Sequence, residues 1–268
     1  MTEEFSPDWL ALREPYDTRA RSEPLARVFL ESLPACPCIL DLGAGRGANA
    51  RYLEGISASE IAWRLVDHNP ELLARADGIR GETSHQIVDF APNPGLIDKS
   101  GLNAISASAL FDLVSEGWFS AFIKAVAGLP LLFALTANGD HAWQPSDPAD
   151  KAVMDEFEAD TRRDKGFGPA MGPDGPARMV DLLSAAGYQV LQESSPWRLG
   201  SADGDLLTSI VDLIADVASQ RGEAQISAGW RERRQNLIEV GALRLDVGHV
   251  DIVALPPNGT QVPRNQFS

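Results

Sequence analysis

Three glycines at alternate positions, Gly43, Gly45 and Gly47, follow a short apolar segment that ends in an acid, Asp41. Because glycine has no side chain, the backbone can turn tightly there and a ligand can lie directly against it. Residues 46–53 are predicted to form a helix whose free N–H groups and positive dipole end face that ligand. A strand, a glycine turn and a helix N-terminus together predict a cradle for a nucleotide or a sulfonium nucleoside.

The glycine pattern alone fits two kinds of cofactor. Residues 43–48 also satisfy the dinucleotide fingerprint G-x-G-x-x-G/A, and Asp67 lies about twenty residues further on, as that fingerprint requires. Asp41, at the end of the first strand, and Asp89, at the end of the third, have no role in that pattern. These two acids favour a sulfonium nucleoside over a nicotinamide dinucleotide.

Residues 38–136 resemble the class I S-adenosylmethionine (SAM)-dependent methyltransferases. Residues 41–47 match the first motif of that family, Asp/Glu-x-Gly-x-Gly-x-Gly. Asp67 matches the acid that ends strand two, and Asp89-Phe90 matches the acid and apolar residue after strand three. The resemblance implies an α/β fold, a seven-stranded, mostly parallel, Rossmann-like sheet with helices on both faces. It also implies that the last strand is antiparallel between strands five and six, and that SAM is the cofactor and S-adenosylhomocysteine (SAH) the product.

The predicted cofactor-binding residues lie in the first four predicted strands or directly after them: Asp41, Gly43, Ala44, Gly45, Gly47, Asp67, His68, Asp89, Phe90 and Ser106. Asp67 is expected to accept hydrogen bonds from both ribose hydroxyls, with a simple surface acid as the alternative. The resemblance implies that Asp89 binds the adenine amino group while Phe90 lies near the ring, although Phe90 also fits an ordinary core position. His68 either stacks on adenine or is only exposed in its loop.

Several arginines precede the glycine turn in an otherwise acidic protein. A guanidinium group pairs with a carboxylate through two parallel hydrogen bonds, and the methionine end of SAM carries such a carboxylate. Arg13 and Arg21 are therefore candidates for binding it. The alternative is that these arginines lie on a solvated face and pair with Glu14 and Asp17.

The chain is expected to form one domain over residues 1–268, with an N-terminal helical segment at 1–34, a substrate cap at 138–176 after strand five, and a flexible tail at 256–268. Strands are predicted at 38–41, 61–66, 85–88, 103–108, 131–137, 188–193 and 245–255. Further helices are predicted at 147–164, 176–186, 205–221 and 224–240. The cap is inferred from the long Gly/Pro-dense loop at its end, because such loops often form lids; a tolerated insertion is the alternative.

Four residues of this region are predicted, from position alone, to contact the acceptor: Trp143, Arg163, Lys165 and Phe167. The two aromatic side chains are expected to wall an apolar pocket. The two cationic side chains are expected to contact polar groups of the acceptor.

Methyl transfer from a sulfonium is an in-line displacement at carbon, so the protein mainly has to position the acceptor and exclude water. A general base helps if the nucleophile carries a proton at neutral pH. His141, just after predicted strand five, is the first candidate, and Asp112, after strand four, is the second. The alternatives are a polar loop residue for His141 and a helix-capping acid for Asp112.

Composition narrows the class of partner. The 268-residue chain carries a formal net charge of −15, which argues against a nucleic-acid substrate and favours a small molecule, neutral or cationic. No apolar run is long enough to span a bilayer, and the start of the chain lacks a positive region, so we expect no membrane partner and a cytoplasmic location. Cys36 and Cys38 have no second pair, so no metal is expected. A homodimer is compatible with the sequence.

The leading hypothesis is therefore an enzyme that transfers a methyl group from SAM to an O or N atom of a small molecule. Two alternatives remain open at this point. One is a non-catalytic SAM-binding subunit that regulates a partner, and the other is an NAD-dependent oxidoreductase that uses the glycine turn at 43–48.

Overall fold

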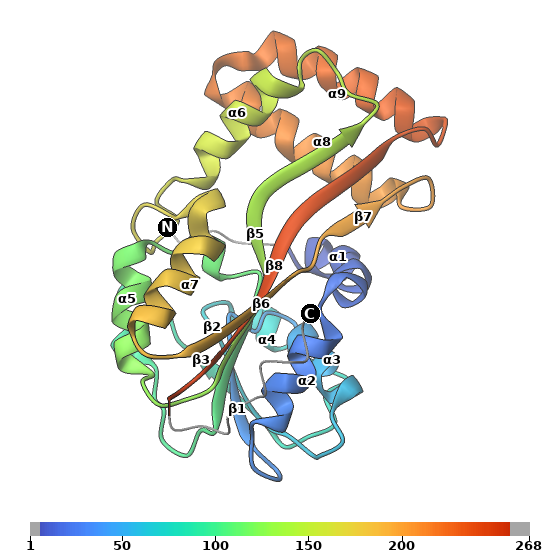
Figure 1. Ribbon diagram of the computed structural model, residues 1–268. Helices are drawn as coiled ribbons and strands as arrows, with labels where there is room; N and C mark the ends of the chain where they lie inside the picture. Colours follow the sequence, from blue (N-terminus) through green and yellow to red (C-terminus); the bar gives the residue numbers. More distant parts are fainter. Residues whose placement is uncertain (1–5, 258–268) are drawn as a thin grey trace.

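The computed structural model describes residues 6–257, and within them eight strands form one mixed sheet of order β3-β2-β1-β4-β5-β8-β6 (Figure 1). The strands are β1 (Cys38–Leu42), β2 (Ala62–Asp67), β3 (Thr83–Ile87), β4 (Ala104–Ser108), β5 (Leu131–Gln144), β6 (Gln189–Ser194), β7 (Trp197–Leu199) and β8 (Arg244–Leu255). Strands β3, β2, β1, β4 and β5 are parallel, and β8 is antiparallel to both of its neighbours. This confirms the predicted seven-stranded path, with the last strand between the fifth and sixth. The short strand β7, which pairs with β8, was not predicted.

Helices cover both faces of the sheet, as predicted. The α-helices are α1 (Pro7–Ala20), α2 (Glu23–Glu31), α3 (Ala48–Ile56), α4 (Pro70–Leu73), α5 (Glu116–Ala125), α6 (Asp150–Thr161), α7 (Gly175–Ala185), α8 (Gly204–Ala218) and α9 (Ala224–Glu239). Helices α2 and α3 pack on one face, where their apolar side chains share a buried cluster with β1, β2 and β8. Helices α5 and α7 pack on the other. The central strands are therefore buried on both faces, as expected for parallel strands between helical layers.

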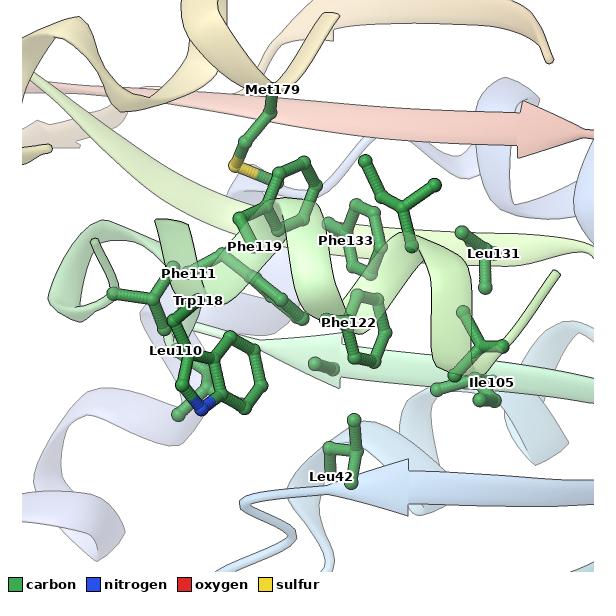
Figure 2. Close-up of a cluster of buried hydrophobic side chains, with 14 of the residues drawn as sticks. Leu42, Ile105, Leu110, Phe111, Trp118, Phe119, Phe122, Leu131, Phe133 and Met179 are labelled. Atoms are coloured by element: carbon green, nitrogen blue, oxygen red, sulfur yellow. The ribbon is translucent and has the colours of Figure 1, made fainter. Parts of the chain in front are cut away.

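The core beneath α5 is rich in aromatic rings (Figure 2). Phe111 follows β4 and its ring centroid lies 4.3 Å from that of Phe133 on β5. Trp118 and Phe122 stack on α5 with centroids 5.6 Å apart. Ser115 begins this helix, because its hydroxyl accepts a hydrogen bond from the Trp118 N–H at 3.2 Å. This packing fixes the loop after β4, which forms part of the site described below.

Strands β5 and β8 continue past the rest of the sheet as a curved, paired arm (Figure 1). Strand five was expected to end at residue 137, but it runs to Gln144, so residues 138–144 are strand rather than cap loop. The register shifts twice along the arm, and Leu135 has a left-handed φ of 54° at the first shift. The buried carboxylate of Asp251 accepts a hydrogen bond from the Leu135 N–H at 2.8 Å and supports this bulge.

A helical cap formed by α6, α8 and α9 lies at the end of this arm (Figure 1). Its core includes Trp143 from β5, Trp197 from β7 and Trp230 from α9. The sequence placed the cap at 138–176, and α6 does lie there. Helices α8 and α9 supply the rest of the cap from a segment some fifty residues further along, and this contribution was not predicted.

Helix α1 lies beside the cap and over the glycine turn. It contacts β7 and α8, and Leu10 lies 3.4 Å from the position that a Cβ on Gly45 would occupy. Among residues 6–257, no helix has the length and apolar character needed to cross a membrane. The tail predicted at 256–268 lies almost entirely outside the described residues.

Candidate functional site

The glycine turn after β1 adopts the left-handed backbone that its sequence predicts. Gly43, Gly45 and Gly47 have φ values of +61°, +51° and +78°. A Cβ at Gly47 would lie only 2.8 Å from the Cδ1 atom of Ile79, so a larger residue there would be both strained and crowded. The turn leads directly into helix α3, as expected from residues 46–53, although the helix begins two residues later.

Asp67 holds the glycine turn from the end of the neighbouring strand β2. Its carboxylate accepts hydrogen bonds from the Gly45 N–H at 2.8 Å and from the Asn69 N–H at 2.9 Å. The Nδ1 atom of His68 lies 3.4 Å from the same carboxylate. Asp67 is 5% exposed and lines the adjacent cavity, so this acid is part of a buried site and not a simple surface acid.

Asp41 lies beneath the turn in a buried polar cluster. Its Oδ1 atom accepts hydrogen bonds from the Ser106 hydroxyl at 2.9 Å and from the side-chain amide of Asn49. No described residue bonds its Oδ2 atom or the Oδ1 atom of Asn49, although both are buried. Burial raises the pKa of Asp41 from 3.8 to about 6, and the two side-chain hydrogen bonds act against this rise. Ser106, predicted to bind the cofactor, donates its hydroxyl hydrogen bond to Asp41 and does not line the adjacent cavity.

A cavity of about 130 Å³, here called the turn cavity, opens over these residues. Its wall includes Asp41, Ala44, Asp67 and His68 from the predicted set, together with Asn49, which the sequence did not single out. The first turn of α3 carries Asn49, and no local pattern marks it. Its role depends on the contact with Asp41 across the fold.

The two consecutive residues predicted to lie at adenine have different surroundings. Phe90 is buried in the wall of the turn cavity, and its ring centroid lies 6.0 Å from that of Phe167. Asp89 is exposed and does not line the cavity; its carboxylate accepts a hydrogen bond from the Ala91 N–H at 3.0 Å. Phe167 was predicted to wall the acceptor pocket, but the structure places it in the turn cavity instead.

The two arginines predicted to bind a carboxylate have different surroundings. Arg13 lines the turn cavity, and its guanidinium pairs with Asp17 at 2.8 Å. The alternative anticipated this pairing but on a solvated face, whereas the side chain of Arg13 is only 13% exposed. Arg21 is buried over the ring of Tyr52, and no described residue bonds its Nε or Nη2 atom. Burial lowers the pKa of Arg21, while the carboxylates of Asp251 and Asp41 act in the opposite direction.

A second cavity of about 450 Å³, here called the cap cavity, adjoins the first beneath helices α6 and α8. The two cavities share three wall residues, Arg13, Ala109 and Leu113. Ala109 follows β4 with a left-handed φ of 52°, which is uncommon for a residue with a side chain and often marks a functional site. The shared wall places the two cavities side by side.

Two histidines on the β5–β8 arm line the cap cavity. The Nδ1 atom of His141 lies 3.0 Å from the carbonyl oxygen of Gly139. Burial lowers the pKa of His141, so its imidazole is neutral at physiological pH. Burial also lowers the pKa of His249 from 6.5 to about 3, and nearby Arg13 and His141 act in the same direction. His141 therefore lies in a strand that faces a cavity and not in a loop.

Of the remaining predicted residues, two line the cap cavity and two do not. Asp112 and the largely buried Lys165 line the cap cavity. Trp143 does not; it packs edge-on against Trp230 in the cap core, with ring centroids 5.3 Å apart. Arg163 does not line the cavity either, and pairs with Asp160 at 2.5 Å.

Most of the cap-cavity wall comes from residues that sequence reasoning did not select. Helix α8 contributes Ile210, Leu213, Ile214 and Val217. The helical spacing of Ile210, Ile214 and Val217 predicted an apolar face, but a buried core face and a cavity wall have the same pattern. Within residues 6–257, no group of three or more His, Cys, Asp or Glu side chains is arranged to hold a metal ion.

Comparison with protein-family models and with curated proteins gives no match, whereas solved structures do match. A putative methyltransferase from Bacillus halodurans is 12% identical over 88% of this chain and 100% of that chain, with a TM-score of 0.51. SAM-dependent methyltransferases in complex with SAH also match. The one from Geobacter sulfurreducens is 13% identical over 94% and 98% of the two chains (TM-score 0.47), and the one from Thiobacillus denitrificans is 14% identical over 94% and 99% (TM-score 0.46). With the strand order, the first match establishes that the chain has the fold of the class I SAM-dependent methyltransferases.

Proposed function

We propose that this protein is a SAM-dependent methyltransferase that transfers a methyl group to an O or N atom of a small molecule by in-line displacement. The observation that carries the proposal is the pair of adjoining cavities with Arg13, Ala109 and Leu113 in their common wall. In open α/β sheets, ligands bind at the carboxyl ends of the strands, where the turn cavity lies. The cap cavity offers room for an acceptor beside it.

The residues of the turn cavity fit the chemistry of this cofactor. The bare glycine turn leaves space against the backbone, and Asp67 at the end of β2 is the acid for the ribose hydroxyls. The buried Oδ2 atom of Asp41, bonded by no described residue, suits the ammonium group of the methionine end. Arg21 is the corresponding candidate for its carboxylate, because no described residue bonds its buried Nε and Nη2 atoms, although Arg21 is not among the residues that line the turn cavity. The apolar wall around Phe90 suits a purine ring.

When bound, SAM supplies an activated methyl group. The protein then has to hold the acceptor in line with that group and exclude water, which in favourable cases is worth roughly 7–11 kcal/mol. The neutral imidazole of His141 lines the cap cavity, where it accepts the proton of the acceptor as general base. Asp112, which lines the same cavity, is the second candidate for this role.

Calorimetric titration of the purified protein with SAM, SAH and NAD tests this proposal. We expect SAM and SAH to bind and NAD to bind far more weakly. Tight binding of NAD, or no binding of SAM and SAH, would contradict it. A non-catalytic subunit would bind SAM yet fail to consume it when a metabolite extract is supplied as the source of acceptors.

A further inference from the structure

The walls of the cap cavity are mainly apolar and aromatic. Helix α6 contributes Met154 and Phe157 to the wall, in addition to the four apolar residues of α8. Trp9 from α1 and Trp197 from β7 complete this part of the wall. Leu213 on α8 is 48% exposed, so this part of the wall reaches solvent. At about 450 Å³, the cavity is in the range that accommodates a drug-sized ligand.

The charged side chains along the wall are already paired with one another or with neighbours. Arg13 pairs with Asp17, and the acids of α6 each pair with a cation, as Asp155–Lys151, Glu158–Arg162 and Asp160–Arg163. Asp112 and Lys165 also interact with other groups. A charged acceptor would therefore have to compete for these partners. Burying a charge without a partner of its own is costly, which favours an uncharged molecule.

Two imidazoles remain as polar features of the wall. His249 has a buried Nδ1 atom that no described residue bonds, and His141 has a contact that defines where its proton lies. A carbonyl oxygen can only accept a hydrogen bond, so the contact with Gly139 places the proton of a neutral ring on Nδ1. The Nε2 atom then has a lone pair, and no described residue donates a hydrogen bond to it. The ring lies edge-on to Phe157, with centroids 5.8 Å apart, and His249 in the same wall packs against Trp197. A hydroxyl hydrogen at the end of an apolar ring is the group that fits here.

Resting on the proposed function, we propose that the acceptor of the cap cavity is an uncharged, mainly apolar molecule that presents a hydroxyl group to Nε2 of His141. An aromatic alcohol has this chemistry. A carboxylate has no hydrogen atom to donate, so it would face the lone pair of Nε2 without forming a hydrogen bond. An ammonium group could donate to it but would lack a carboxylate that is not already engaged.

Three probes of nearly the same shape separate these possibilities. Calorimetric titrations of the protein at neutral pH, without cofactor, would use 2-naphthol, 2-naphthoate and 2-naphthylmethylammonium. We expect 2-naphthol to bind at least about tenfold more tightly than either ion. Equal or tighter binding of either ion, or no binding of 2-naphthol, would overturn the proposal. Because the titrations need no cofactor, their result is independent of whether SAH binds.

Two tryptophan variants locate the binding site. Val217→Trp adds bulk at a half-buried position in the cavity wall, and we expect it to weaken 2-naphthol binding about tenfold or more while SAH binding is unchanged. Val240→Trp, at a position 75% exposed, is the matched control and should leave both affinities unchanged. Undiminished 2-naphthol affinity in Val217→Trp would place the binding elsewhere and overturn the assignment. If the wild type does not bind SAH, that result would instead contradict the proposed function.

Discussion

The turn cavity and the cap cavity adjoin, yet they are built in opposite ways. Buried polar groups shape the turn cavity, with Asp41 and Asp67 carried by strands in the centre of the sheet. The cap cavity is walled mainly by apolar side chains from α1, α6, α8 and the β5–β8 arm, and the charges along it are already paired. The first cavity therefore presents polar groups at fixed places in its wall, whereas the second presents mainly an apolar surface.

This difference in lining indicates that the two cavities select their ligands in different ways. A buried carboxylate such as Asp41 is costly unless a ligand completes its bonds, so the turn cavity is suited to one ligand. An apolar cavity selects by size and shape, and a few polar groups fix the orientation of what it holds. Substitutions in the first region should therefore affect cofactor affinity, and substitutions in the second should affect the acceptor and the rate.

The largest effect is expected at His141, the proposed general base and hydrogen-bond partner of the acceptor. Replacing it with phenylalanine keeps the ring but removes Nε2, and should lower the rate of methyl transfer from SAM to 2-naphthol about 10²–10⁴-fold. SAH affinity should stay unchanged, which calorimetry can check. His85→Phe, on the exposed part of β3, is the matched control. A rate within a few-fold of wild type would remove His141 from catalysis.

The wild type and His141→Phe should also differ in how their rates of methyl transfer depend on pH. Burial lowers the pKa of His141 below its usual 6.5, so its base form persists at neutral pH and is lost only as pH falls through that lowered pKa. The wild-type rate should therefore be constant near neutral pH and decline under acidic conditions. The residual rate of His141→Phe should not show this decline, and an identical decline in both proteins would assign it to another group.

Asp67→Ala should have the largest effect on the turn cavity. The substitution removes the hydrogen bonds to Gly45 and Asn69 and the proposed bonds to ribose. We expect SAH affinity to fall about 100-fold, or ~2.7 kcal/mol. The affinity of 2-naphthol for the cap cavity should change little. Unchanged SAH affinity would withdraw the ribose assignment.

Asp41→Asn should change folding stability and SAM affinity in opposite directions, so it separates these two properties at the turn cavity. Because burial raises the pKa of Asp41, the folded protein holds this proton more tightly than the unfolded chain. The stability of the wild type without ligand should therefore decrease as pH rises from 3.8 to about 6 and remain lower above that range. Asn carries no charge, so the variant should be more stable than wild type at neutral pH, by up to about 3 kcal/mol, while binding SAM more weakly.

Asp251→Asn is the matched control for this experiment. Asp251 is also buried, but its carboxylate accepts hydrogen bonds from Ser22, Leu135 and Ser195. An amide cannot replace all three acceptor contacts, so we expect this variant to be less stable at neutral pH by about 1–3 kcal/mol. Denaturant titrations of both variants at acidic and neutral pH would check the predicted gain in stability of Asp41→Asn and the predicted loss in Asp251→Asn. A loss of stability in Asp41→Asn at neutral pH would contradict the first of these predictions.

The smallest effect is expected at Asp89. The family resemblance assigns the adenine amino group to this acid, but its exposed carboxylate engages the Ala91 N–H outside the cavity wall. We expect Asp89→Ala to weaken SAH binding less than about tenfold, through a displaced turn beside Phe90. A loss as large as that of Asp67→Ala would restore the direct contact implied by the resemblance.

The two cavities also differ in how far the sequence could predict them. The glycine turn and its acids are local patterns, because the spacing of Asp41 and the glycines itself dictates a strand, a turn and a helix start. The family resemblance carried by these patterns implied the fold class, which is confirmed. Asn49 could not be found in this way, since its role depends on a contact between α3 and the end of β1.

The cap cavity depends on tertiary assembly. Strand β5 was expected to end at residue 137, and its continuation is stabilised by pairing with β8, more than a hundred residues later. Trp143 was therefore placed in an acceptor pocket, although the extended strand carries it into the cap core. The apolar face of α8 was visible in the sequence, but only the fold shows that it borders a cavity.

A crystal structure of the protein with SAH tests the relation between the two cavities most directly. We expect the nucleoside in the turn cavity beside Asp67, with the sulfur atom directed toward the wall that Ala109 and Leu113 share with the cap cavity. SAH bound with its sulfur directed away from the cap cavity, or bound outside the turn cavity, would contradict the proposed arrangement of cofactor and acceptor.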